Sequence, residues 1–201
     1  TTLHYIANDQ PLHDGELVLI DAGAEYQGYA ADVTRTYPIG GRLEGAQREI
    51  YEVVLAAQEA GLALSKPGST LDAIHDAALR RLVEGLIDLR LLSGSLDERI
   101  EAGDYRPYYM HRTSHWLGLD VHDVGNYVQE EKPRVLESGM AFTVEPGLYI
   151  AAHTEDKAAK HFRGIGVRIE DDVVITQSGH ENLNSAIPKR SEEIEAWVAG
   201  N

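Results

Sequence analysis

The sequence contains no cysteine among its 201 residues. A disulfide framework and a thiolate metal site are therefore both excluded, so any metal must be held by oxygen atoms and imidazole nitrogens. Long apolar runs are also missing, since the run from Leu17 to Ile20 is far below the roughly 20 residues that a bilayer requires. Nothing resembles a signal peptide, and we expect a cytoplasmic protein that does not bind membranes.

Positive charge is scarce, because 18 Lys and Arg stand against 33 Asp and Glu and give a formal charge of -15. This balance repels nucleic acid and anionic lipid, so neither is expected as a partner. A composition of 43% hydrophobic and 25% charged residues is typical of a globular protein with a real core. The chain starts at Thr1 without an initiator Met, and we expect it to be a fragment whose upstream part is missing.

No strand is followed by a glycine-rich phosphate loop, so a dinucleotide site is not expected. The spacing of apolar residues predicts the secondary structure. Helices are expected from about Leu43 to Leu64, after Ser69 or Thr70 as far as Leu86, and from Ser191 to Val198; strands are expected at Leu17–Ala22, Tyr29–Tyr37, Met140–Tyr149 and Val167–Ile175. The polar stretches 92–107 and 151–163 are expected to be irregular. This order of elements favours an α+β domain over a parallel βαβ array.

Asp21 and Asp32 lie in a stretch whose pattern predicts a strand, a turn and a second strand. A turn centred between Tyr26 and Gln27 would place the two aspartates opposite each other on one face of the hairpin. Like charges in that position are destabilising, and a bound cation would reverse the sign of the interaction. Turns attract aspartate, so a pair that caps a turn and meets solvent is the alternative. The apolar run that leads into Asp21 favours the cation site.

Three of the nine histidines lie close together, at His111, His115 and His122. The alternation from Leu117 to Val121 predicts a strand with one buried face. Such histidines can bind a metal or hydrogen-bond an oxyanion, and purely structural histidines are the alternative. His115 and His122 would point to opposite faces of a regular strand, so a bend at Gly118 is needed to bring them to one site. No Glu follows His111, which rules out a helical zinc motif.

Glu145 and Glu170 are each associated with an apolar strand. Glu145 follows the run Met140–Val144, and Pro146 directly after it ends ladder pairing. Glu170 would lie on the same strand face as Arg168, so a simple ion pair is an alternative explanation. Inward-facing charges on apolar strands need compensation, and a single shared metal site would compensate all of them together.

Four motifs occur in the order hairpin 21–36, Ser114–Gly125, Thr143–Tyr149 and Gly166–Asp172. Together they resemble the catalytic domain of Xaa-Pro aminopeptidase, also called aminopeptidase P, and the likeness spans nearly the whole chain. The resemblance implies the pita-bread α+β fold, a pseudo-symmetric pair of halves with mostly antiparallel sheet flanked by helices. It also implies that residues 1–201 form a single catalytic domain, truncated on its N-terminal side and without the family's separate N-terminal domain.

The resemblance implies two divalent metal ions, commonly manganese, with zinc or cobalt as further possibilities. The ligands carried over from the matched motifs are Asp21, Asp32, His115, Glu145 and Glu170, with Asp32 and Glu170 bridging the ions. His4 and His122 match histidines that contact the substrate and stabilise the tetrahedral intermediate, and His111 matches another active-site histidine. Tyr149 and Arg168 match a pair that orients Asp21.

The implied reaction is hydrolysis of the N-terminal peptide bond before a proline in second position, by a metalloaminopeptidase. Paired ions would acidify a shared water and polarise the carbonyl, and Glu145 would carry the proton to the leaving nitrogen. Prolidase shares the fold and ligands but requires a dipeptide; His115-Trp116 favours the aminopeptidase. A non-catalytic peptide-binding module of the same fold is a further alternative, opposed by the presence of all five ligand types. The truncation leaves the activity of this fragment open, and a homo-oligomer is expected.

Overall fold

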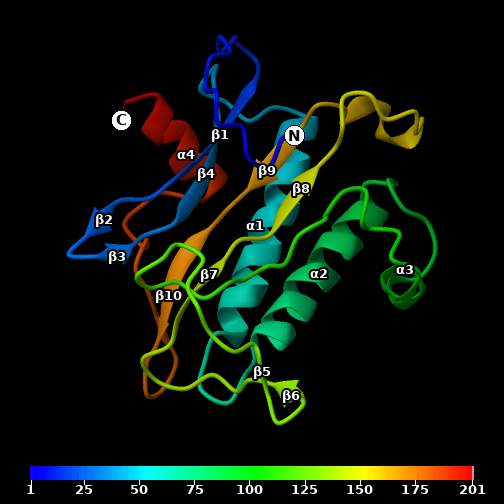
Figure 1. The fold of residues 1–201 in the computed structure, drawn as a ribbon. Coiled ribbons are helices and arrows are strands. Elements are labelled where there is room, and N and C mark those ends of the chain that lie inside the picture. The colour runs from blue at the N-terminus through cyan, green and yellow to red at the C-terminus, as the bar shows by residue number, and fades with distance from the viewer. Residues whose placement is uncertain (201) are drawn as a thin grey trace.

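The computed structural model describes residues 1–200 as a set of short antiparallel strands with two long helices packed against them (Figure 1). The strands are β1 (Leu17–Ala22), β2 (Glu25–Tyr26), β3 (Tyr29–Ala30), β4 (Val33–Pro38), β5 (Val128–Gln129), β6 (Lys132–Pro133), β7 (Ala141–Val144), β8 (Gly147–Tyr149), β9 (Gly166–Arg168), β10 (Asp171–Ile175) and β11 (His180–Asn182). The helices are α1 (Ala46–Leu64), α2 (Leu71–Asp88), α3 (Leu96–Ala102), the 3₁₀ helix η1 (Ala158–His161) and α4 (Ser191–Val198).

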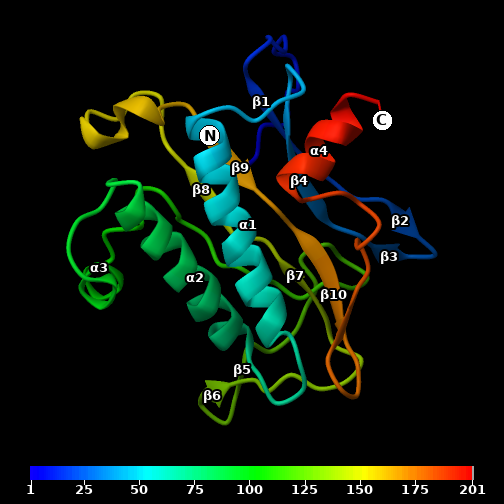
Figure 2. The same cartoon turned by 180° about the vertical axis from the view of Figure 1, so that it is seen from behind.

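All strand pairs that the structure describes are antiparallel. β1 pairs with β4, β8 pairs with β9, and β10 lies between β7 and β11. The small hairpins β2–β3 and β5–β6 complete the set. Figure 2 shows α1 and α2 side by side in front of β7 to β10, while α4 lies beside β4. The layers are those of the expected α+β domain.

The two long helices form where the apolar spacing predicts them. Ile50, Val54 and Ala57 on α1 are fully buried, as a helical stripe facing a core should be. α1 begins at Ala46, three residues later than expected, and α2 begins directly after Thr70. The Thr70 hydroxyl caps α2 by accepting the Ala73 amide at 3.0 Å.

The core has two parts, one on each half of the strand layer. The larger cluster packs α1 and α2 against β8 and β9, and includes Leu82, Leu148, Val167 and Ile169. The smaller cluster lies around β7 and β10 and is centred on Phe142. No helix in the described part of the chain is long and apolar enough to cross a membrane.

Three of the four expected strands are broken in the structure. The expected strand Tyr29–Tyr37 divides into β3 and β4, with Asp32 between them. Met140–Tyr149 divides into β7 and β8 around Glu145 and Pro146, and Val167–Ile175 divides into β9 and β10 around Glu170. Each break therefore falls at a residue expected to bind metal. A side chain in a break is released from the strict alternation of a pleated strand and can turn toward a shared centre.

The expected hairpin turn is wrong by one position, which shifts the pairing along β4 by two residues. β1 and β4 pair Asp21 with Thr34 rather than with Asp32, because the turn is centred between Gln27 and Gly28. Both turn residues have positive φ, at 54° and 86°, which suits the tight turns that match the twist of a hairpin. The error is an even number of residues along β4, so Asp32 keeps the same strand face and becomes a diagonal neighbour of Asp21.

Two helices lie in stretches expected to be irregular. α3 starts after Ser95, whose amide donates to the Glu98 carboxylate at 3.2 Å, and ends at Ala102, which is followed by Gly103 with φ 72°. This capping box and C-terminal glycine were readable in the sequence and were overlooked. The 3₁₀ helix η1 lies in the second stretch. The terminal helix α4 has the expected bounds.

Candidate metal centre

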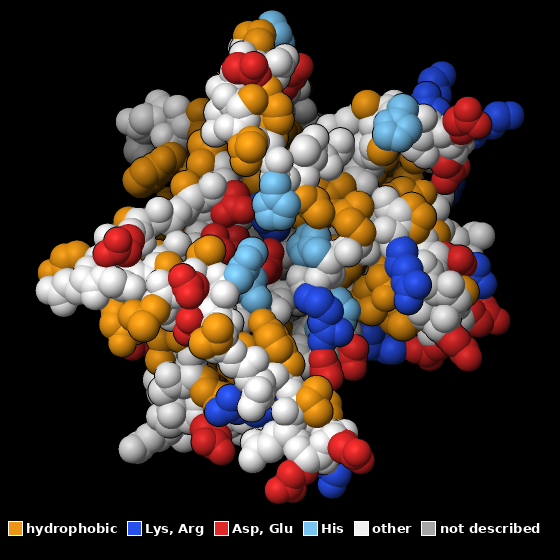
Figure 3. Space-filling model, viewed as in Figure 1, with side chains coloured by type: hydrophobic (Ala, Val, Ile, Leu, Met, Phe, Trp, Pro, Cys, Tyr) orange, Lys and Arg blue, Asp and Glu red, His pale blue; other side chains and the backbone are white. Residues whose placement is uncertain are grey.

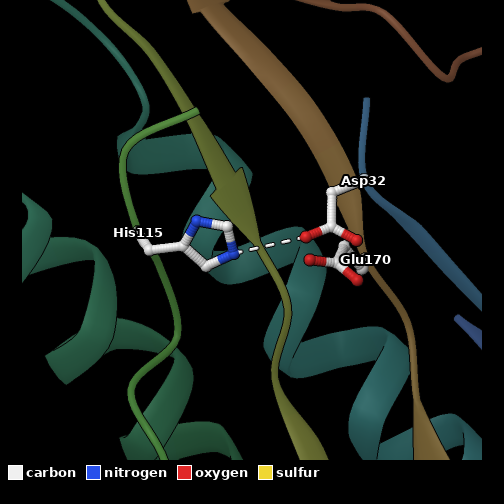
Figure 4. A group of neighbouring side chains, drawn as sticks. All are labelled: Asp32, His115 and Glu170. Carbon is white, nitrogen blue, oxygen red and sulfur yellow. Dashed lines mark ion pairs between the residues drawn. The ribbon is translucent and has the colours of Figure 1, made fainter. Parts of the chain in front are cut away.

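Three side chains from separate parts of the chain converge in the middle of the molecule. Asp32, His115 and Glu170 each present one potential ligand atom, and these atoms lie within 4.8 Å of one another. Figure 4 shows the His115 ring pointing at the Asp32 carboxylate, with Glu170 beside it. The distance from His115 Nε2 to Asp32 Oδ2 is 3.4 Å. This spacing is compatible with side chains that share a cation.

Glu145 and Asp21 extend this group on its two sides. Glu145 Oε1 lies 3.3 Å from His115 Nε2, and Asp21 lines the same cavity as Asp32. All five expected ligands line one cavity of about 220 Å³. Figure 3 shows histidine and acidic side chains gathered at a hollow near the middle of this face. The structure therefore brings together residues that are spread over most of the chain.

The expected histidines line the same cavity. His4, His111 and His122 are all in its wall, as is Arg168. Leu3, Arg112 and Ser114 also line the cavity and were not anticipated. Of the residues expected at the site, only Tyr149 is not in the wall; its hydroxyl accepts a hydrogen bond from Arg168, which is in the wall.

The chain bends after His115, as was expected if His115 and His122 are to reach one site. The Asp123 amide donates to the Trp116 carbonyl at 3.0 Å, and the Gly118 amide donates to the Asp120 carbonyl at 3.2 Å. The rings of His115 and His122 come to a centroid distance of 4.4 Å, at right angles. The strand expected from Leu117 to Val121 is wrong, because this segment is irregular and its Leu119 and Val121 side chains are exposed.

His115 is held in the tautomer that a metal ligand needs. Its Nδ1 lies 3.0 Å from the Trp116 carbonyl, which can only accept, so Nδ1 donates and Nε2 is left with a free lone pair toward the acidic group. Burial lowers the pKa of His115, but the Asp32 hydrogen bond, the Trp116 carbonyl and the neighbouring carboxylates outweigh burial and raise it. The ring is thus arranged to face a positive charge, either a proton or a cation.

A hydrogen-bonded chain leads from His111 to Asp21. Arg168 Nη2 donates to Asp21 Oδ2 at 2.6 Å, and Arg168 Nη1 donates to the Tyr149 hydroxyl at 3.0 Å. The Tyr149 hydroxyl lies 2.9 Å from His111 Nε2. His111 Nδ1 faces the Arg112 carbonyl, so Nδ1 donates, Nε2 accepts from Tyr149, and the ring is neutral. Burial, which lowers the pKa of His111 to about 4, is consistent with this neutral state.

The carboxyl groups of the site repel one another without a cation. Burial raises the pKa of Glu145 to about 7. Burial and the charges of Glu145 and Asp32 raise the pKa of Glu170 well above its usual range. Burial also raises the pKa of Asp21 despite Arg168, whereas at Asp32 the hydrogen bonds to His115 and Asp21 outweigh burial and lower the pKa. Four carboxyl groups are hard oxygen donors and one imidazole is an intermediate nitrogen donor, so the residues present fit a divalent metal site.

Several supporting residues were not predicted from the sequence. The Thr34 hydroxyl donates to Glu170 Oε2 at 2.5 Å, and the Thr143 hydroxyl donates to Glu145 Oε1 at 3.1 Å. Asp172 Oδ2 accepts the Asp32 amide at 3.0 Å. The sequence did contain a signal for Asp172, because it ends a run of three acidic residues within an apolar strand. Each buried carboxylate in such a strand needs a partner, and not only Glu170.

Comparison with known proteins places these features in a family. Residues 1–177 match metallopeptidase family M24. The chain is 53% identical over 196 residues to an Xaa-Pro aminopeptidase of Escherichia coli, covering 98% of this chain and 44% of that protein. The chain thus spans less than half the length of this curated relative.

Solved structures agree with the sequence comparison. The aminopeptidase PepP of Pseudomonas aeruginosa superimposes with a TM-score of 0.95 at 51% identity, covering 98% of this chain and 45% of that one. A zinc-substituted aminopeptidase P of E. coli, in complex with product, gives a TM-score of 0.93 at 52% identity, covering 98% of this chain and 44% of that one. The expected pita-bread fold is confirmed, and the family supports a divalent metal as cofactor.

Proposed function

We propose, since the chain belongs to metallopeptidase family M24, that it carries the catalytic metal site of an Xaa-Pro aminopeptidase. Such an enzyme removes the N-terminal residue from a peptide whose second residue is proline. The observation that carries the proposal is the convergence of Asp21, Asp32, His115, Glu145 and Glu170 on one cavity. The similar E. coli protein is named for this activity and is 53% identical. Because the chain spans 44% of that protein, the activity is proposed for the whole protein to which this chain corresponds.

The five residues would hold two divalent ions, with manganese as the proposed metal. Asp32 lies between Asp21 on one side and His115 on the other, which supports a bridging role for Asp32. Glu170 is the second proposed bridge, since its carboxylate lies in the same group as Asp32 and His115. When bound, such a pair lowers the pKa of a water molecule and polarises the scissile carbonyl.

The proposed role of Glu145 is to move a proton from the attacking water to the leaving proline nitrogen. Its carboxyl group is buried between Thr143 and His115. As a carboxylate at the metal group, Glu145 would lie within reach of a water held there, as a proton carrier must.

His122 and His4 are proposed to contact the peptide. His122 stands edge-on to His115, and His4 lines the cavity beside Asp21 and Asp32. A ring N–H from either residue could stabilise negative charge on the carbonyl oxygen. His111 uses both ring nitrogens in hydrogen bonds to Arg112 and Tyr149, so we assign it to holding Arg168 and, through it, Asp21.

The test compares a tripeptide, Gly-Pro-Ala, with the dipeptide Gly-Pro, using the protein loaded with manganese chloride. Release of glycine from the tripeptide is expected, whereas hydrolysis confined to the dipeptide would show a prolidase. Asp32→Ala should abolish both metal uptake and hydrolysis, while Asp97→Ala, at an exposed carboxylate on α3, should change neither. A wild-type protein that takes up no manganese, zinc or cobalt would instead be a peptide-binding module. A cytoplasmic location and a homo-oligomer remain predictions.

A further inference from the structure

The two proposed bridging ligands lie next to strands of different sheets. Asp32 precedes β4, which pairs with β1, whereas Glu170 precedes β10, which pairs with β7 and β11. Among the described residues, one backbone hydrogen bond joins the two segments directly, from the Glu170 amide to the Thr34 carbonyl at 3.0 Å. A regular ladder therefore does not set the separation of the two carboxylates. Side chains must do so.

Arg35 is the side chain best placed to connect the two segments. Its guanidinium is 2% exposed, and hydrogen bonds use all five of its N–H donors. The acceptors are the Thr34 carbonyl at 2.9 Å, the Glu170 carbonyl at 2.6 Å, Asp171 Oδ1 at 2.6 Å, the Ile187 carbonyl at 3.1 Å and the Pro188 carbonyl at 2.9 Å. Arg35 of β4 thus donates hydrogen bonds both to the backbone of Glu170 and to the side chain of Asp171.

Asp171 holds Arg35 in this position. Its carboxylate is fully buried and accepts hydrogen bonds from four side chains on four segments. The donors are Arg35 at 2.6 Å, Gln58 of α1 at 2.8 Å, Asn182 of β11 at 2.7 Å and Lys189 at 2.5 Å. Because buried, charge-assisted hydrogen bonds are strong and directional, this fully bonded carboxylate leaves Arg35 little freedom to move.

The connection also runs in the opposite direction. Asp172 of β10 accepts the backbone amide of Asp32 at 3.0 Å, and Thr34 donates its hydroxyl to the Glu170 carboxylate at 2.5 Å. Each ligand segment therefore holds the ligand of the other.

We propose that Arg35, paired with Asp171, is a positioning residue that sets the separation of Asp32 and Glu170 and hence the geometry of the metal pair. The proposal rests on the proposed two-metal function. Ligand distances must match a metal within about 0.2 Å, so a small displacement of either bridge matters. Lysine at position 35 would keep the charge but lose the planar fork, and one ammonium group cannot reproduce all five bonds.

The experiment compares three proteins of the same length: the wild type, the variant Arg35→Lys and a matched control variant, Arg80→Lys. Arg80 forms an exposed pair with Asp97 on the surface. Each protein is titrated with manganese chloride by calorimetry, and electron paramagnetic resonance then records whether the two Mn²⁺ ions are magnetically coupled. Arg35→Lys should bind manganese about 10- to 100-fold more weakly, as expected when a group that orients ligands is lost, and its coupled signal should change. Arg80→Lys should match the wild type in both measurements.

The possible results distinguish a failure of the proposed positioning role of Arg35 from a failure of the proposed two-metal function. A wild-type chain that binds fewer than two ions, or gives no coupled signal, contradicts the proposed function before any variant is compared. If the wild type behaves as proposed and Arg35→Lys shows the same affinity and signal, the positioning role is wrong. Circular dichroism of the metal-free proteins checks folding, and Asp171→Asn, which keeps the side-chain size, replaces Arg35→Lys if that variant unfolds. Unfolding of both variants would assign the pair to fold stability and overturn the inference.

Discussion

Glu145 should destabilise the metal-free fold at neutral pH, and bound metal should offset this effect. Burial raises the pKa of its carboxyl group from an ordinary 4.5 to about 7. A carboxyl group with a raised pKa contributes fully to stability below its unfolded pKa, and that contribution is lost as the pH rises through the folded value. At pH 8 the metal-free fold must bury the charged form, whereas at pH 4.5 it buries the neutral acid.

The substitution Glu145→Gln isolates this effect because it is nearly isosteric and cannot ionise. At about 1.4 kcal/mol per pH unit, the difference between 4.5 and about 7 corresponds to roughly 3 kcal/mol. In chelator at pH 8, Glu145→Gln should therefore be more stable than the wild type by up to this amount. For a chain of this size, that is a rise in Tm of about 6–12 °C. The advantage should shrink toward zero at pH 4.5.

Manganese should narrow this difference in stability at pH 8. The wild type would gain about 2.7 kcal/mol at a metal concentration of 100 times Kd, and Glu145→Gln, with one ligand lost, would gain less. Thermal unfolding with chelator and with manganese, at pH 4.5 and pH 8, measures all four conditions. Glu137→Gln, at an exposed carboxylate, serves as the control and should stay within about 0.5 kcal/mol of the wild type. A metal-free Glu145→Gln that is no more stable than the wild type at pH 8 would refute the reasoning.

Three further outcomes are expected. Gly23→Ala should destabilise the fold by roughly 1–3 kcal/mol or more and should lower the affinity for manganese. The added Cβ would lie 1.6 Å from the Ala31 carbonyl oxygen, in the segment between the two aspartates. The control Gly179→Ala, where the added Cβ meets open space, should leave both thermal unfolding and calorimetric titration unchanged. Arg168→Met should weaken manganese binding about 10- to 100-fold by freeing Asp21, and equal titration curves for variant and wild type would contradict that role. Dialysis against chelator should abolish tripeptide hydrolysis and manganese chloride should restore it, whereas activity that survives complete metal removal would exclude a metal-dependent reaction.

Several candidate ligands could be identified from the sequence because they are chemically out of place, whereas the complete ligand set and the roles of His4, His111, Tyr149 and Arg168 came from the family resemblance. A carboxylate at the end of an apolar run, as at Asp21 or Glu145, needs a partner wherever the fold puts it. The requirement that the chain bend at Gly118 followed from the odd spacing of His115 and His122. These inferences used the composition of short segments and needed no tertiary information.

The local backbone at the ligands was not accessible in the same way. Periodicity predicts continuous strands through Asp32 and Glu170, because the apolar residues on both sides of each ligand continue the pattern. Packing of separate small sheets interrupts the strands at those points, and that packing is a tertiary effect. The error of one position in the hairpin turn has a similar origin. Gln27 has a positive φ and is part of the turn, and Gln is an uncommon residue for that conformation.

The supporting contacts were also beyond the sequence. Arg35 and Asp171 are 136 residues apart, and no local pattern indicates that they meet. Thr34 was predicted as a strand residue, which it is, but its bond to Glu170 depends on how two sheets approach each other. Residues that position ligands across sheets are therefore visible only once the fold is known.

The convergence of the five ligand side chains on divalent cations is tested most directly by anomalous diffraction at the manganese absorption edge, on crystals grown with manganese chloride. Two anomalous peaks are expected inside the cavity lined by Asp21, Asp32, His115, Glu145 and Glu170, with Asp32 and Glu170 in contact with both. A map with no peak in that cavity, or with manganese bound only at surface carboxylates, would contradict the metal centre and with it the proposed peptidase activity.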